Sequence, residues 1–182
     1  MGLSTLAQSY KTFFLDQPHG TANVKTLALE ITGGAELEGL VELCQGKQPY
    51  PIPEAAAWTI RYAITKLPEL QTKAGSALLK TLPEINRDSY IKNVLGIIKH
   101  HPISDILYGR LADACLNYLS EPFRSKAVHY YSVEIMTVIC MNVPELTREF
   151  LLLAAELEPR SSNAMQRKLV KVRKLLNKKR KT

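Results

Sequence analysis

The sequence predicts an all-α fold, a short right-handed α-α superhelix of about ten helices joined by short corners. Apolar residues recur at the i, i+3, i+4, i+7 spacing of amphipathic helices, and no segment keeps the alternation of a strand. One corner occurs twice, as Leu67–Leu70 and as Val143–Leu146, and a third proline corner follows His101. Because one helix pair cannot bury its own apolar faces, pairs of this length are expected to stack.

Residues 1–46 predict a group of N-terminal helices. A short mixed helix ends near Pro18, a second is stopped by Gly33 and Gly34, and a third ends at Gly46. Residues 47–53 contain three prolines and predict an irregular loop. We interpret this loop as a projection from one continuous domain over residues 1–182, although a domain boundary at this point is the alternative.

Residues 53–158 predict helical hairpin repeats. Proline is favoured at the first helical position because its missing N–H has no partner there, and the residue before proline is kept out of the helical region. We therefore place each corner inside a hairpin. The expected second helices of the hairpins cover residues 70–82, 104–118 and 146–157.

Residues 161–178 predict a final helix that caps the stack, with Ser161 or Ser162 at its start and apolar positions along one side. Residues 179–182 predict a basic, frayed tail. The net charge of +7 originates here, because nine of the 24 Lys and Arg lie between Arg167 and Thr182, with no acidic residue among them. The rest of the chain carries 15 basic and 17 acidic residues.

Three widely spaced cysteines, Cys44, Cys115 and Cys140, lie in apolar helical patterns and predict buried thiols in a reducing, cytoplasmic setting. No run of apolar residues is long enough to cross a bilayer. The histidines and cysteines show no metal-ligand spacing, and no nucleophile or phosphate-loop motif is present. We therefore expect no catalytic residue, no metal and no cofactor, and an enzyme is the less favoured hypothesis.

The corners, the entry Ser120–Pro122 before a long helix, and the segment Ser161–Ala164 before a basic helix resemble HEAT and armadillo-like repeat proteins. They are similar to a group of small bacterial HEAT-like proteins built as one short α-α superhelix. This resemblance covers residues 53–176 best. It implies a solenoid that binds partners on a curved surface, and it implies no reaction.

The first functional hypothesis is a non-catalytic scaffold or protein–protein interaction module, with another protein as its partner. The alternative is nucleic-acid binding through the basic C-terminal helix and basic concave positions. The helix and tail candidates are Arg167, Lys168, Lys171, Lys174, Lys178, Lys179, Arg180 and Lys181.

The concave-face candidates follow from the expectation that the second helix of each hairpin lines the concave side. They are Lys73, Lys80, Arg110 and Arg148. A repair-type version of the alternative is similar to HEAT-like DNA glycosylases, in which a basic concave surface carries aromatic and carboxylate groups. In this chain Trp58, Tyr62 and Asp113 are the residues that could supply those groups.

Overall fold

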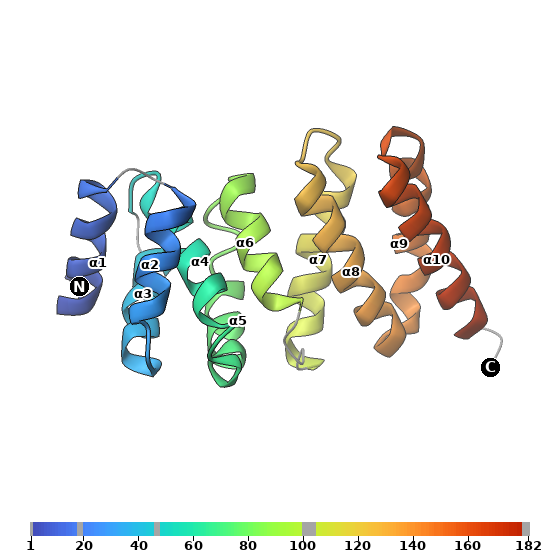
Figure 1. The fold of residues 1–182 in the computed structure, drawn as a ribbon. Helices are drawn as coiled ribbons and strands as arrows, with labels where there is room; N and C mark the ends of the chain where they lie inside the picture. Colours follow the sequence, from blue (N-terminus) through green and yellow to red (C-terminus); the bar gives the residue numbers. More distant parts are fainter. Residues whose placement is uncertain (1, 18–19, 46–47, 100–104, 180–182) are drawn as a thin grey trace. The chain divides into compact units, whose positions relative to one another are not determined.

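The structure, a computed structural model, describes residues 2–17, 20–45, 48–99 and 105–179. Within these ranges every regular element is an α-helix or a short 3-10 helix, so the predicted all-α class is confirmed (Figure 1). The α-helices are α1 Thr5–Asp16, α2 Thr21–Glu30, α3 Gly34–Gln45, α4 Ile52–Ala63, α5 Gln71–Leu79, α6 Asp88–Ile98, α7 Asp105–Ser120, α8 Lys126–Asn142, α9 Thr147–Leu157 and α10 Asn163–Lys179. The 3-10 helices are η1 Pro68–Leu70, η2 Pro144–Leu146 and η3 Glu158–Arg160.

The chain divides into two compact units, Met1–Pro102 and Ile103–Thr182, which we call unit 1 and unit 2. The division falls after Pro102, and the third proline corner predicted there lies outside the described residues. The expectation of a single domain over residues 1–182 stays a prediction.

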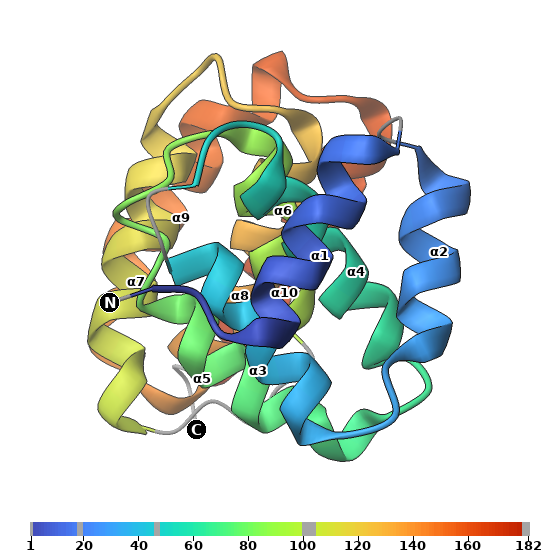
Figure 2. The ribbon, with the colours of Figure 1, turned by 90° about the vertical axis from the view of Figure 1, so that its left-hand side faces the viewer.

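Unit 1 has two layers of helices. In one layer α3 packs against α1 and α5, and in the other α4 packs against α2 and α6. The layers are joined because α3 packs on α4 and α5 packs on α6. Figure 2 views this unit from the α1 end, with α2 beside α4. The core between the layers includes the fully buried side chains of Leu37, Leu40, Ile60, Leu78 and Leu95.

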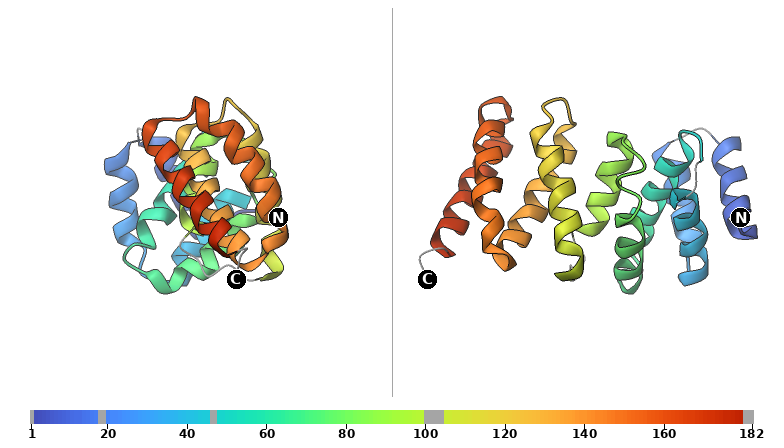
Figure 3. Two further views of the ribbon diagram at one scale, coloured as in Figure 1. Left: turned by 90° about the vertical axis from the view of Figure 1, so that its right-hand side faces the viewer. Right: turned by 180° about the vertical axis from the view of Figure 1, so that it is seen from behind.

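Unit 2 repeats the same arrangement with two helix pairs. Helix α7 packs on α8 and on α9, and α8 packs on α10 (Figure 3). Helix α8 is apolar on several sides, as its sequence predicts, and it buries Val133, Met136 and Ile139. Ser125 begins this helix, and its hydroxyl accepts a hydrogen bond from the Val128 N–H at 3.4 Å.

The pairing of the helices differs from the sequence-based prediction. We expected each Pro-Glu-Leu corner to lie inside a hairpin, but the helices that pair are α3 with α4, α5 with α6 and α7 with α8. The corners at Pro68 and Pro144 form η1 and η2, and they connect the second helix of one repeat to the first helix of the next. The sequence marks where the chain turns, but both kinds of turn contain proline, so the turn alone does not give the phase of the repeat.

Candidate functional site

Helix α10 has the apolar side that its sequence predicts. Met165, Leu169, Val172 and Leu176 are buried, and the helix packs on α8, α9 and η3. Ser162 is the residue at its start, where the hydroxyl accepts a hydrogen bond from the Met165 N–H at 3.4 Å. The final helix therefore has a fixed orientation, and this orientation decides which of its cations face solvent.

Three cations of α10 lie beside its buried side and contact the rest of unit 2. Lys168 Nζ is 2.8 Å from Glu134 Oε1 and 4.3 Å from the centre of the Tyr130 ring. Arg173 forms an ion pair with Glu158, and Lys179 Nζ donates to a main-chain carbonyl of α8. Arg173 is not among the cations that we predicted from the sequence. Its carboxylate partner lies in η3, 15 residues earlier, and helical spacing cannot predict this pair.

The other four cations of α10 form a row on the opposite side, which we call the outward row. These residues, Arg167, Lys171, Lys174 and Lys178, are exposed, and none pairs with a carboxylate among the described residues. Their spacing of four, three and four residues keeps them on one side over about 16 Å of helix. Because α10 contains no Asp or Glu, the row is a continuous positive surface. The remaining tail candidates, Arg180 and Lys181, lie outside the described residues.

Two exposed aliphatic side chains lie at matching levels of the neighbouring helices α8 and α10. Lys168 reaches Glu134 and Lys179 reaches the carbonyl of Met141, so the two helices run in the same direction with a fixed register. That register places Leu175 at the level of Val138. Their exposed fractions are 45% and 46%. We call this pair, with Lys171 and Lys178 on the same side of α10, the α8–α10 surface.

The second layer of unit 1 carries an aromatic pair on its outer surface. The rings of Trp58 and Tyr62 lie one turn apart on α4, with centroids 6.2 Å apart and planes tilted by 32°. Lys25 of α2 holds its Nζ 5.4 Å from the centre of the Tyr62 ring. Both rings were named in the sequence analysis, but Lys25 was not, because it lies in a different helix.

Arg61 occupies the groove between α4 and α6 on the same surface. Its Nη1 donates to Asn93 Oδ1 at 3.4 Å, and the Asn93 amide in turn donates to the Ser89 carbonyl at 3.0 Å. A Cβ added to Gly96 would lie 2.9 Å from the Arg61 Cζ, so the guanidinium rests against the glycine. Beside it a cavity of about 370 Å³ is lined by Arg61, Gly96 and Lys99 together with Ile64, Thr65 and Gln71.

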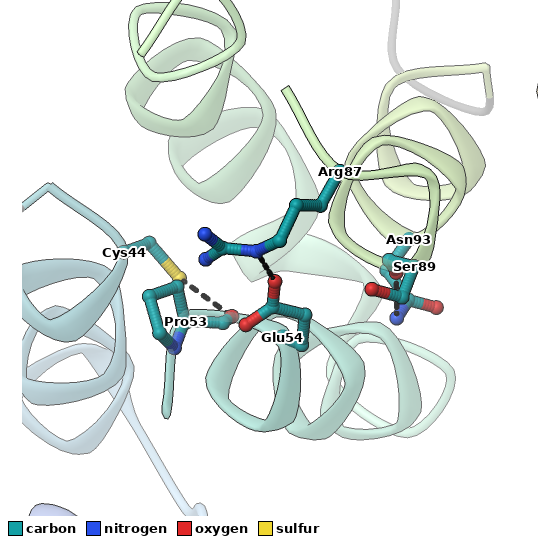
Figure 4. A network of polar contacts seen from close by, with 6 residues as sticks. All are labelled: Cys44, Pro53, Glu54, Arg87, Ser89 and Asn93. Atoms are coloured by element: carbon teal, nitrogen blue, oxygen red, sulfur yellow. Dashed lines mark hydrogen bonds and ion pairs between the residues drawn. The ribbon is translucent and has the colours of Figure 1, made fainter. Parts of the chain in front are cut away.

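A buried polar network lies below this surface, at the start of α4 (Figure 4). Glu54 is 6% exposed and forms an ion pair with Arg87, which precedes α6. Glu54 Oε2 has no hydrogen-bond partner among the described residues. The Cys44 thiol of α3 donates to the Pro53 carbonyl at 3.7 Å. The network ties α3, α4 and α6 together, and it presents no open site.

The three thiols are buried and unpaired. Burial raises the pKa of Cys44 and of Cys115 to about 12 and that of Cys140 to about 11. These groups stay protonated near neutral pH, and a protonated, inaccessible thiol is a poor nucleophile. Among the described residues, no group of three or more His, Cys, Asp or Glu side chains could hold a metal ion. His129 is buried, with Nε2 3.0 Å from the Glu121 carbonyl oxygen, while His19, His100 and His101 lie outside the described residues.

A model of the HEAT repeat domain family matches residues 13–179, which is most of the chain. The chain belongs to the HEAT repeat family. No curated protein and no solved structure matches it. The predicted HEAT-like solenoid fold is thereby confirmed. In the part of the chain that the structure describes, no helix is long and apolar enough to span a bilayer.

Three of the four concave-face candidates lie on first helices of their HEAT repeats and the fourth directly follows one, so the structure does not place them on second helices. Lys73 is on α5, Lys80 is the residue after α5, Arg110 is on α7 and Arg148 is on α9. All four are exposed, and Lys73 pairs with Glu38 of α3. The prediction was wrong because it began each repeat one helix too early. Such a shift exchanges first helices for second helices, and with them the two layers. Their role in binding stays a prediction.

The glycosylase-like arrangement places its residues in different units. Trp58 and Tyr62 are on α4 of unit 1, whereas Asp113 is exposed on α7 of unit 2, a first helix of its HEAT repeat. The three residues proposed for a repair-type reaction are therefore divided between the two units.

Proposed function

We propose that this chain is a non-catalytic HEAT scaffold that binds a partner protein. HEAT repeats are commonly protein-interaction scaffolds, because stacked repeats present a long surface built from successive helices. The three buried, unpaired thiols are consistent with the reducing cytoplasm that we expect for the chain.

The observation that carries the proposal is the α8–α10 surface. Val138 and Leu175 are two aliphatic side chains that remain nearly half exposed, and Leu175 lies one turn from both Lys171 and Lys178 on α10. Aliphatic anchors inside a polar rim are the usual composition of a protein-binding surface. The positive rim favours a partner segment that is acidic as well as apolar, such as an amphipathic helix with Leu and Glu at helical spacing.

Site-specific photo-crosslinking in cells tests this proposal. A photoreactive amino acid at position 138 should give a discrete crosslinked protein, and the same group at position 152 should not. Leu152 is the matched control because it is 60% exposed on α9, in the other layer of the same unit. Val138→Glu and Leu175→Glu should each weaken binding of an acidic amphipathic peptide about tenfold, measured by fluorescence anisotropy. Equal crosslinking at both positions, or unchanged peptide affinity, would contradict the proposal.

A second candidate function, nucleic-acid binding, is favoured by the outward row of α10. Four unpaired cations along one side can follow a phosphate backbone, and the logarithm of the affinity for duplex DNA would then fall with a slope of about −3.6 against the logarithm of the salt concentration. Anisotropy with a labelled duplex measures this slope. Reversing the charge of Arg167 and Lys174 should reduce it by about 1.8. Reversal of Lys168, which is already paired with Glu134, serves as the comparison.

A further inference from the structure

We propose that the outer surface of α2, α4 and α6 in unit 1 binds single-stranded nucleic acid. Unpaired bases would stack on the Trp58 and Tyr62 rings while phosphates contact Lys25, Arg61 and Lys92. We call these five residues the aromatic surface. The aromatic surface contains no residue of α10, and it shares with the second candidate function only the class of ligand.

The rings are placed for stacking rather than for a role in the core. Trp58, Arg61 and Tyr62 are the positions of α4 that stay partly exposed, whereas the rest of the helix is buried. Every base has a π-face, so a tryptophan and a tyrosine one turn apart accept successive bases without selecting a sequence. Arg61 lies on the α6 side of the rings, in contact with Asn93, where its guanidinium can contact a phosphate.

Cations lie on both sides of the rings. Lys25 contributes from α2, where it already sits over the Tyr62 ring. Lys92 contributes from α6. Glu54 pairs with Arg87 and Arg61 contacts Asn93, so α4 and α6 run in the same direction and Lys92 lies at the level of Trp58. Neighbouring helices are about 8–10 Å apart, which puts α2 and α6 roughly 16–20 Å apart across α4. A stacked strand covers that distance with about five nucleotides.

Cations outnumber carboxylates on the side of these three helices that carries the aromatic pair. Glu54 is buried and paired with Arg87, one turn before Trp58. Asp88 is in the first turn of α6, four residues before Lys92, so it lies on the same side of that helix and offsets part of the positive charge there. Glu30 is the last residue of α2, five residues after Lys25. The surface is thus positive around two partly exposed rings. Duplex DNA hides its base faces and an acidic peptide needs no flat ring, so a single strand fits best.

The emission of Trp58 gives a direct test, because Trp58 is the only tryptophan of the chain. We expect oligothymidylate and oligouridylate of about twelve nucleotides to quench this emission on binding, and a duplex of the same length to leave it unchanged. The two single strands distinguish DNA from RNA. A glutamate-rich peptide is the third ligand, and quenching by the peptide alone would overturn the proposal in favour of an acidic protein.

Four variants make the test specific, with binding followed by anisotropy and folding by circular dichroism. Trp58→Leu, which keeps apolar volume but removes the ring, should weaken binding about tenfold or more, and Trp58→Phe should restore most of it. Lys25→Glu with Lys92→Glu should reduce the salt slope by about 1.4. Lys80→Glu, an exposed reversal after α5 in the other layer, is the matched control and should change the affinity far less.

Charge reversal of the outward row of α10 separates this inference from the second candidate function. If single-stranded binding and Trp58 quenching persist in that variant, the aromatic surface binds single strands without a contribution from the outward row of α10. If quenching is absent in the wild-type protein, or if Trp58→Leu and Lys80→Glu bind alike, the inference is wrong.

Discussion

Replacing Arg87 by methionine should show how strongly the buried Glu54 carboxylate depends on its partner. Glu54 is 6% exposed, and Oε2 has no hydrogen-bond partner among the described residues, so the ion pair is the main compensation for its burial. Removing one member of a buried pair costs about 3–5 kcal/mol. The Arg87 side chain is 43% exposed, so water reaches this site and we expect a smaller cost, about 2–3 kcal/mol.

The double variant Glu54→Met with Arg87→Met provides the decisive comparison. With both charges removed, an apolar pair of similar size fills the site, and we expect the free energy of unfolding to return to within about 1 kcal/mol of the wild-type value. Urea denaturation followed by Trp58 emission measures all three proteins, because Trp58 is on the same helix as Glu54. If Arg87→Met is neutral, or if the double variant is as unstable as the single one, our account of this pair fails.

The remaining predictions concern the thiols, the glycines and α10. Burial raises the pKa of Cys44 and Cys115 to about 12, so the unfolded chain loses these protons first and stability should fall above pH 9, by about 1.4 kcal/mol per pH unit for each thiol. Urea titrations in reductant between about pH 8 and 10 check this, and Cys44→Ala should flatten the dependence. A Cβ at Gly39 would lie 3.1–3.3 Å from three atoms of α1, so Gly39→Leu should cost about 2–3 kcal/mol in thermal unfolding. Gly109→Ala, with nothing within 4 Å, should stabilise by about 0.5–1 kcal/mol. Leu169→Ala should cost about 2–5 kcal/mol by chemical denaturation, since Leu169 lies on the buried side of α10.

The position of Leu169 also affects how the basic helix should be tested. Deleting residues 167–182 would remove the charges together with Leu169, Val172 and Leu176, which are all buried. A loss of binding after that deletion could come from unfolding of the last repeat. Charge reversal at exposed positions of the outward row leaves the buried side intact and is therefore the informative change.

The helices and their buried sides could be predicted from the sequence, because helical spacing is a local property. The apolar side of α10 is an example, since Met165, Leu169, Val172 and Leu176 follow the period and are all buried. The phase of the repeat could not be predicted. A corner such as Pro68–Leu70 shows that the chain turns. Whether the following helix, α5, pairs with α4 before the corner or with α6 after the next turn depends on contacts between residues distant in sequence.

The candidate surfaces could be predicted only in part, for the same reason. The cations of α10 are visible in the sequence, but their division into a paired and an outward group depends on Glu134 and Glu158, which lie in other elements. Trp58 and Tyr62 could be noticed one turn apart, whereas Lys25 reaches Tyr62 from a helix more than 30 residues away. A surface that several helices build together cannot be predicted from the sequence pattern of any single helix.

The two Pro-Glu-Leu corners have a consequence for how this chain could be lengthened. Because each corner begins a first helix, the segment from Pro68 to Val143 contains two whole repeats, α5 with α6 and α7 with α8. Duplicating residues 68–143 in tandem would add complete pairs and leave every first helix beside its own second helix. A duplication begun at Ile52 and ended at Leu79 would instead insert α4 and α5, two halves of different repeats. The two Pro-Glu-Leu corners are thus the positions at which whole repeats can be inserted or removed.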